Sequence, residues 1–355
     1  MITTHLTSTT LTLLFTIFIT NTHAFTNPIK SPAADPSITV RKKNYYLTAT
    51  GTTQITVTRS RTLTGLQNGT TTQVWADDTP TRDRDIWAPE IHLIDSTWYI
   101  LYSASGSANG RSKRSHVLKG TGCDPETGGE NGEGDGPDRC VYEWLAELTP
   151  EEGKQAGSDR RDPESIDGTY LVVEGERYHV VSAKDSDGEA ALQISRLDTE
   201  SWKVEGWTVI ARANRKWERD EVPLLEGPHP LYHNGSIWLS YSGSFCGSPD
   251  YALGLLHYIG PDPLSASSWV KVSTTRPVVS KANGNYGTGH NCFFYSPDGT
   301  EIWNAFHATA NSSGSCGVDR YTMASKMTFD EDNKPVFGVP EELGTTIQAP
   351  SGERA

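Results

Sequence analysis

The strongest constraint on the fold is a sequence pattern that occurs five times along the chain. Each copy begins with a short strand-like stretch, continues through a tight turn typical of hairpins, and ends in alternating aromatic and β-branched residues. The copies start near residues 35, 88, 167, 226 and 289. Because one small sheet cannot bury its faces alone, such repeated units are expected to stack around an axis. The pattern predicts an all-β chain that forms a five-bladed β-propeller. The alternative is a β-sandwich with accidental internal similarity.

Two segments depart from this pattern. The chain between about residues 106 and 165 interrupts the second copy and is rich in Gly, Asp and Glu, which predicts a long acidic loop. Residues 346–355 follow the last copy and are predicted to be a disordered tail. Residues 25–345 are expected to form a single domain, because all-β repeat folds can be this long.

Residues 1–24 resemble a secretory signal peptide. The apolar run Leu11–Ile19 is too short to cross a bilayer, and Ala24 offers a small residue at a cleavage point. The residues before the run include no Lys or Arg, which is unusual for such a signal. We expect a secreted, extracellular protein with no membrane segment.

Secretion permits disulfides, and the chain has five cysteines, so at least one is expected to stay unpaired. Cys123 and Cys140 bracket one Gly-rich loop and are expected to pair. Three alternative pairs remain open among Cys246, Cys292 and Cys316. Three acceptors for N-glycosylation are expected on exposed turns: Asn68, Asn234 and Asn311.

The charge of the chain limits its partners. The net charge of −13 and the pI near 5.2 argue against nucleic acid, which is bound through Lys and Arg. This balance suits an extracellular protein that acts on a neutral ligand. We expect no organic cofactor.

Three copies of the repeat begin with a carboxylate: Asp35, Asp167 and Glu226. The first strands of the blades line the centre of a propeller, so these side chains are expected to converge at one end of the channel. Glu90 lies one position further along in the second copy, and His290 starts the fifth. Hydrolysis of a glycosidic bond needs one acid and one base, and a third carboxylate nearby raises the pKa of the acid. A single acid at a turn is more simply a cap, but three at matching positions favour a shared site.

These residues resemble glycoside hydrolase family 43. The likeness lies in Ala34-Asp35-Pro-Ser, Ser165-Ile-Asp167-Gly-Thr-Tyr, Glu226-Gly-Pro and Gly287-Thr-Gly-His290-Asn, and it covers about residues 35–340. The resemblance implies a five-bladed β-propeller and an inverting enzyme. It makes Asp35 the general base, Asp167 the group that orients and raises the pKa of the acid, and Glu226 the general acid.

The same resemblance places further residues in the site. The channel histidine of the family falls on His290, beside which a calcium ion or a cluster of ordered water is expected. Trp87 and Arg320 would contact the substrate; the alternatives are core packing for Trp87 and a surface salt bridge for Arg320. Asp162 follows Arg161 as in the related invertase-type families. Their nucleophile motif Asn-Asp-Pro-Asn-Gly is Ala-Asp-Pro-Ser-Ile here, so Asp162 is expected to be a loop residue.

Within the family the chain is most similar to the α-L-arabinofuranosidases, including exo-acting enzymes. This implies a monomeric enzyme that acts on arabinan or arabinoxylan of the plant cell wall. A β-xylosidase or an endo-arabinanase shares the same three acids. A non-catalytic carbohydrate-binding propeller or a protein-binding propeller is a further alternative, but neither explains why all three acids are present.

Overall fold

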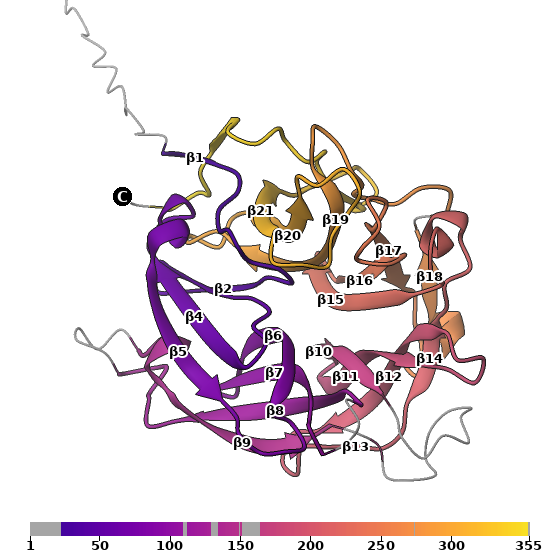
Figure 1. The fold of residues 1–355 in the computed structure, drawn as a ribbon, viewed down its shortest axis with the longest axis horizontal. Coiled ribbons are helices and arrows are strands. Elements are labelled where there is room, and N and C mark those ends of the chain that lie inside the picture. Colours follow the sequence, from indigo (N-terminus) through magenta and orange to yellow (C-terminus); the bar gives the residue numbers. More distant parts are fainter. Residues whose placement is uncertain are drawn as a thin grey trace, which may run out of the picture.

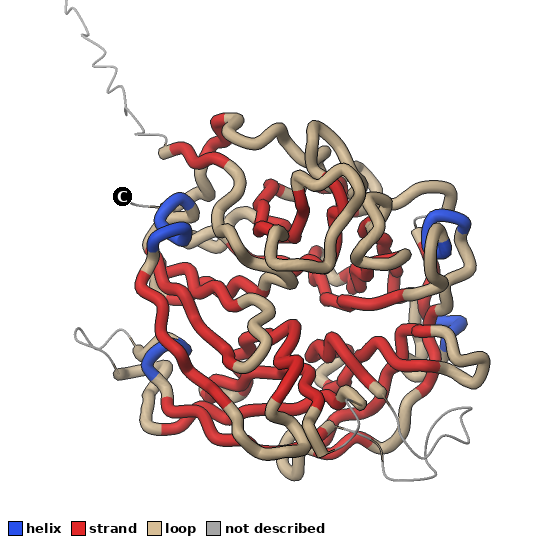
Figure 2. The backbone as a smooth tube through the Cα atoms, viewed as in Figure 1, coloured by secondary structure: helices blue, strands red, loops and turns tan. Residues whose placement is uncertain are grey.

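The computed structural model describes residues 23–108, 112–128, 134–148, 150, 164–272 and 274–353. Within these ranges the chain forms β-strands, and its only helices are short 3-10 turns at the rim (Figure 2). The 3-10 turns are η1 (Thr64–Asn68), η2 (Pro137–Arg139), η3 (Lys216–Arg219) and η4 (Ala266–Ser268). The prediction of an all-β chain is confirmed. None of the helices in these ranges has the length and hydropathy that crossing a membrane requires.

The five repeats form five antiparallel hairpins, each extended by further strands. The first three sheets are β2 (Ser37–Arg41), β3 (Asn44–Thr48), β4 (Gln54–Ser60) and β5 (Thr70–Ala76); β6 (Arg84–Ile94), β7 (Thr97–Ser105), β8 (Arg114–Thr121) and β9 (Val141–Glu147); and β10 (Ser165–Val173), β11 (Glu176–Lys184), β12 (Ala190–Asp198), β13 (Lys203–Val204) and β14 (Thr208–Ala211). The last two repeats give β15 (Leu225–His233), β16 (Ser236–Gly243), β17 (Ala252–Tyr258) and β18 (Trp269–Lys271), then β19 (Tyr286–Tyr295), β20 (Ile302–Thr309) and β21 (Tyr321–Lys326). A single parallel bridge, Ala252 to Thr288, joins these last two groups into one sheet.

Four of the five hairpins close with two-residue turns. The residue pairs that bound them are directly opposite in the ladders, and both turn residues have positive φ. The turns are Lys42-Lys43, Asp95-Ser96, Glu174-Gly175 and Asn234-Gly235. This geometry matches the right-handed twist of paired strands.

The first strands of the five hairpins form an inner ring. In sequence order β2, β6, β10, β15 and β19 each contact the next, and β19 contacts β2. Figure 1 shows the sheets arranged around this centre. The five repeat starts are therefore brought together at one end of the ring.

Side-chain packing joins neighbouring sheets around the ring. Five of the buried clusters each draw residues from two neighbouring sheets, and one of these five joins the first and last sheets. Representative pairs within single clusters are Ile55 with Trp98, Leu101 with Trp202, Leu192 with Leu239, Leu253 with Phe306, and Tyr45 with Trp303. The core is thus divided among the spaces between sheets.

Two predictions about segments were wrong. The expected acidic loop of residues 106–165 contains β8 and β9, and the Gly-rich run lies in the connection between them. The expected disordered tail contains β24 (Thr346–Gln348), which pairs with β1 (Ala24–Thr26). The backbone N–H of Leu63 also donates to Glu353 in the tail (3.1 Å). Because β1 and β24 are remote in sequence, no local sequence pattern indicated that they pair.

The cysteines form two disulfides. Cys123 pairs with Cys140, as predicted, and Cys246 pairs with Cys316, leaving Cys292 as a buried thiol. The three asparagines of the glycosylation motifs are exposed, as expected. Two predictions cannot be compared with the structure: the signal peptide up to residue 22 and the loop residue Asp162 lie outside the described residues.

Candidate active site

Each repeat start contains one residue in the left-handed region. These residues are Asp35 (φ 52°), Ala88 (φ 43°), Asp167 (φ 57°), Gly227 (φ 57°) and His290 (φ 45°). The ladder register shifts beside four of them, which is the mark of a β-bulge. The structural counterpart of Asp35 in the fourth repeat is therefore Gly227, and Glu226 reaches the site from one position earlier.

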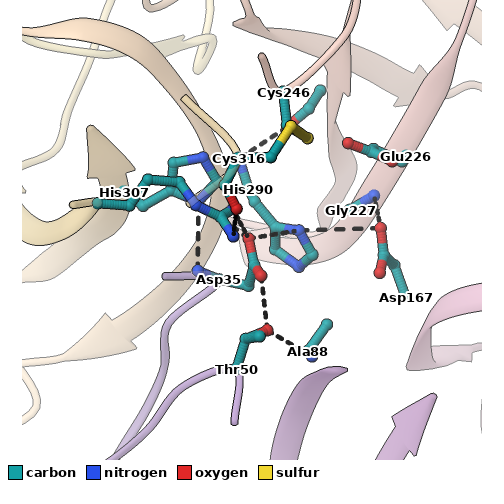
Figure 3. Close-up of polar contacts among 12 residues, drawn as sticks. Asp35, Thr50, Ala88, Asp167, Glu226, Gly227, Cys246, His290, His307 and Cys316 are labelled. Carbon is teal, nitrogen blue, oxygen red and sulfur yellow. Dashed lines mark hydrogen bonds and ion pairs between the residues drawn. A yellow bond between two sulfur atoms is a disulfide. The ribbon is translucent and has the colours of Figure 1, made fainter. Parts of the chain in front are cut away.

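All six predicted site residues line one cavity of about 540 Å³ at this end of the inner ring. They are Asp35, Trp87, Asp167, Glu226, His290 and Arg320. Figure 3 shows Asp35, Asp167 and Glu226 gathered around His290. Residues almost 300 positions apart in the chain are thus brought together by the ring of sheets.

Asp35 is held as a carboxylate by several donors. Arg320 Nη1 donates to Oδ1 (3.0 Å), and the Thr50 hydroxyl donates to Oδ2 (2.6 Å). Nδ1 of His307 accepts the backbone N–H of Asp35 (3.2 Å) and lies 3.0 Å from Oδ1. Burial alone raises the pKa of Asp35, but the charges of His290 and Arg320 outweigh it and hold that pKa well below its usual range. An ionised carboxylate at this place can accept a proton from water.

Arg320 is fixed by a loop and is not free on the surface. Its guanidinium donates to the carbonyl oxygens of Cys316 (2.9 Å) and Gly317 (3.2 Å) as well as to Asp35. The Cys246–Cys316 disulfide ties this loop to the loop that precedes β17, and both cysteines line the cavity. The surface salt bridge considered for Arg320 is replaced by a buried pair with the candidate base.

Asp167 is buried beside the other two acids. Its Oδ2 accepts the backbone N–H of Gly227 (3.1 Å). Burial and the charge of Asp35 raise the pKa of Asp167 to about 8. A Cβ on Gly227 would lie 3.1 Å from the His290 ring, so a larger residue here would require that ring to shift slightly.

Glu226 is the least buried of the three carboxyl groups, and its Oε1 accepts a hydrogen bond from the Tyr251 hydroxyl (2.8 Å). Burial and the charge of Asp167 raise the pKa of Glu226 to about 8. Asp167 and Glu226 titrate as a coupled pair, so at neutral pH the pair retains a proton. Its place on the cavity suits Glu226 to deliver that proton to a ligand.

His290 lies between two carboxylates. Its Nδ1 is 3.4 Å from Asp35 Oδ1 and 3.8 Å from Asp167 Oδ2. Calcium takes six to eight oxygen ligands, and no group of three or more His, Cys, Asp or Glu in the described ranges is placed to hold a metal. Calcium beside His290 therefore stays a prediction, and no chemical step is derived from it.

Trp87 supplies the aromatic surface of the cavity. The Nζ of Lys113 lies 4.4 Å from the centre of the ring, and the ring also lines the cavity. Sugar C–H groups pack well against such an apolar, electron-rich ring. The described part of the acidic segment therefore reaches the site through Lys113.

Sequence reasoning missed three residues of the site. Thr50 and His307 contact Asp35, and Tyr251 contacts Glu226. Thr50 follows the first hairpin and His307 lies in β20, so neither stands at a repeat start. Glu90 is placed elsewhere: it is buried and pairs with His92 (2.9 Å). Only the alignment of second strands with first strands could have suggested His307.

An all-β scaffold that gathers a low-pKa carboxylate and two raised-pKa carboxyl groups in one cavity is typical of hydrolases that cleave glycosidic bonds. The family model described as glycosyl hydrolases family 43 matches residues 25–335, and the chain belongs to that family.

Similar proteins have related descriptions. The chain is 31% identical over 334 residues to an extracellular exo-α-(1→5)-L-arabinofuranosidase of Streptomyces avermitilis, covering 91% of this chain and 65% of that protein. It is 30% identical to α-L-arabinofuranosidase 43 of Humicola insolens, with coverage of 91% and 65%. The chain therefore spans slightly less than two thirds of the length of these relatives.

Solved structures share the fold. The α-L-arabinofuranosidase from Lactobacillus brevis superposes with a TM-score of 0.76 at 24% identity, covering 90% of this chain and 98% of that one. A thermostable family-43 glycoside hydrolase gives 0.67 at 21% identity, with coverage of 93% and 99%.

Proposed function

We propose that this protein is a secreted hydrolase that removes L-arabinofuranosyl groups from arabinan or arabinoxylan with inversion at the anomeric carbon. The observation that carries the proposal is the unequal setting of the acids. Asp35 is held ionised, whereas Asp167 and Glu226 have a raised pKa in the same cavity. The names of the relatives support the choice of sugar.

The ring of sheets supports a five-bladed β-propeller. Five repeats give five hairpins whose first strands contact one another in a closed order. The strands of the fourth and fifth repeats would be separate blades linked by one bridge. In such a ring every blade buries its faces against two neighbours.

The mechanism is a single displacement. Asp35 removes a proton from water as the water oxygen bonds to the anomeric carbon. The bond from that carbon to the leaving oxygen breaks, and Glu226 gives its proton to that oxygen. Asp167 and the carboxylate of Asp35 stabilise positive charge that develops on the sugar ring. The raised pKa of Glu226 keeps the donor protonated at neutral pH.

The sugar is tested with chromogenic substrates. The purified protein is incubated with para-nitrophenyl α-L-arabinofuranoside and β-D-xyloside, and with branched and debranched arabinan. We expect release of arabinose from the arabinofuranosides. Release from the xyloside alone would favour a β-xylosidase, and cleavage limited to internal bonds of debranched arabinan would favour an endo-arabinanase. Binding without release from any substrate would favour a carbohydrate-binding propeller.

The active protein is expected to be a monomer by light scattering.

Variants of the two acting groups test the mechanism. Glu226→Gln and Asp35→Asn are each expected to lower kcat by roughly 100- to 10,000-fold, the usual share of acid or base catalysis. A substrate with an activated leaving group needs less help from an acid. It should therefore partly restore the kcat of Glu226→Gln but not that of Asp35→Asn. Glu176→Gln, on an exposed strand end, is the control. Near-normal turnover in either site variant, with the fold intact by circular dichroism, would refute the assignment.

A further inference from the structure

Tyr251 is a buried side chain that directly contacts the candidate proton donor. It has no exposed surface and precedes β17, and its hydroxyl lies 2.8 Å from Glu226 Oε1. A buried tyrosine hydroxyl needs a partner, because leaving it without one is costly. The choice of this carboxyl as the partner has consequences for where Glu226 holds its proton.

The Tyr251 hydroxyl is the donor in this contact, and Glu226 Oε1 is the acceptor. The neighbouring Ser242 hydroxyl accepts the backbone N–H of His290 at its Oγ (2.7 Å).

We propose that Tyr251 is the positioning residue of the proton donor: it keeps Glu226 Oε1 as an acceptor, so that the proton given to the leaving sugar is carried on Oε2. A protonated carboxyl group accepts hydrogen bonds best at its carbonyl oxygen, so a donor to one oxygen favours the proton on the other. Among the described residues, Oε2 has no hydrogen-bond partner and is left for the ligand. This proposal rests on the function proposed above.

The ring of Tyr251 is fixed on two sides. It stacks on His307, with ring centres 5.6 Å apart and planes inclined by 4°. Gly289 lies against another part of the ring: a Cβ built there would be 2.2 Å from Cε1 of Tyr251. His307 in turn contacts Asp35, so one stacked pair links the candidate acid and the candidate base.

Removing the Tyr251 hydroxyl is expected to change the pKa of Glu226 in one direction. The charged groups that face Glu226 are Asp35, Asp167 and His290. The charges of Asp167 and Asp35 raise the pKa of Glu226, whereas the Tyr251 hydrogen bond, like the charge of His290, lowers it because it favours the carboxylate. Its loss is therefore expected to raise that pKa and to let the proton occupy either oxygen.

The test is Tyr251→Phe, which keeps the ring and its packing. The infrared carboxyl band that disappears in Glu226→Gln is followed with pH in the wild-type and variant proteins. We expect the midpoint of this band to move up by roughly one pH unit, as for loss of one hydrogen bond to a charged group. We also expect the basic limb of kcat/KM to move by the same amount. With a poor leaving group, kcat should fall roughly 10-fold or more, within the range of acid catalysis.

The matched control is Tyr241→Phe. Tyr241 is also fully buried, and its hydroxyl donates to a glutamate, Glu218 (2.7 Å), away from the cavity. The Tyr241→Phe protein should be less stable than the wild type, with no shift of the Glu226 infrared band. Gly289→Ala is a second site variant, since its methyl must displace the Tyr251 ring, and it should shift the band in the same direction.

The outcomes are distinct. An unchanged midpoint in folded Tyr251→Phe, or an equal shift in Tyr241→Phe, would overturn the role of Tyr251. Absence of hydrolysis by the wild-type protein together with a shifted band would overturn the proposed function, and with it the catalytic role of Tyr251, while leaving its effect on the protonation of Glu226 established.

Discussion

At the scale of residues, the pKa of the candidate base Asp35 is determined by its neighbours more than by its own burial. Asp35 and Asp167 are both buried aspartates in one cavity, yet the pKa of Asp35 is lowered and that of Asp167 is raised. Arg320, His290 and His307 face Asp35, whereas Asp167 faces the carboxylate of Asp35. The acid and base roles follow from these different neighbours.

Thr50 allows the setting of Asp35 to be tested without changing a charge. Its hydroxyl donates to Asp35 Oδ2 and accepts the backbone N–H of Ala88 (2.8 Å). Thr50→Val should raise the pKa of Asp35, because a donor to the carboxylate is lost, and the acidic limb of kcat/KM should move up by roughly one pH unit. Thr50→Ser keeps the hydroxyl and should retain the wild-type profile. Identical acidic limbs in the Val and Ser variants would contradict this role.

The sequence identified the site residues at repeat starts because the repeat itself aligns them. Asp35, Asp167 and His290 occupy one structural position, with positive φ, in three copies. Thr50, Tyr251 and His307 could not be found in this way, because they reach the site from hairpin ends and from second strands. Their contacts depend on the curvature and register of the sheets, which periodicity does not specify.

At the scale of elements, a disulfide connects the fourth and fifth repeats above the cavity. Cys246 follows β16, and Cys316 lies in the loop between β20 and β21 whose carbonyl groups hold Arg320. Sequence reasoning left three pairings open, since it could not show which loops meet. The loop arrangement explains why Cys292, in the middle of β19, stays a thiol.

The two disulfides should differ in their effect on activity. Replacing Cys246 and Cys316 with Ser should lower kcat/KM severalfold, because the loop no longer fixes Arg320 against Asp35. Replacing Cys123 and Cys140 with Ser is the control, since neither lines the cavity. The Cys246–Cys316 disulfide closes a loop of 70 residues, and its removal is expected to cost about 4 kcal/mol of stability. The Cys123–Cys140 disulfide closes a loop of 17 residues, and its removal is expected to cost about 3 kcal/mol. Denaturant unfolding and steady-state kinetics at low temperature separate the two effects. Equal loss of activity in both double variants would contradict a specific role of the Cys246 loop.

At the scale of the whole molecule, the ring is held together by contacts between its two ends. The first and last sheets share a core that includes Tyr45 and Trp303, and the paired strands β1 and β24 pack against it through Phe25 and Ile347. The number of repeats predicted the ring, but not the strand pair that fastens it. That pair joins residues more than 300 positions apart, and a pattern read along the chain does not contain such information.

Removing the terminal strand tests this fastening. Deletion of residues 346–355 removes β24 and leaves the backbone N–H of Leu63 without Glu353. We expect a loss of roughly 3 kcal/mol in the free energy of unfolding, from lost apolar contacts and an unpaired N–H group. Glu353→Gln keeps the acceptor and should be close to neutral. Urea unfolding gives both values, and an unchanged midpoint after the deletion would show that β24 adds nothing.

The pairing of β1 with β24 also places residues 24 and 348 side by side at one edge of the ring (Figure 1). The chain could therefore begin at a different sheet while the sheets keep the same positions in space. A circularly permuted chain, joined by a short linker between these strands and opened in another exposed connection, should rebuild the same cavity. In such a chain Asp35 would no longer be the first acid in the sequence, although its neighbours in space would be unchanged.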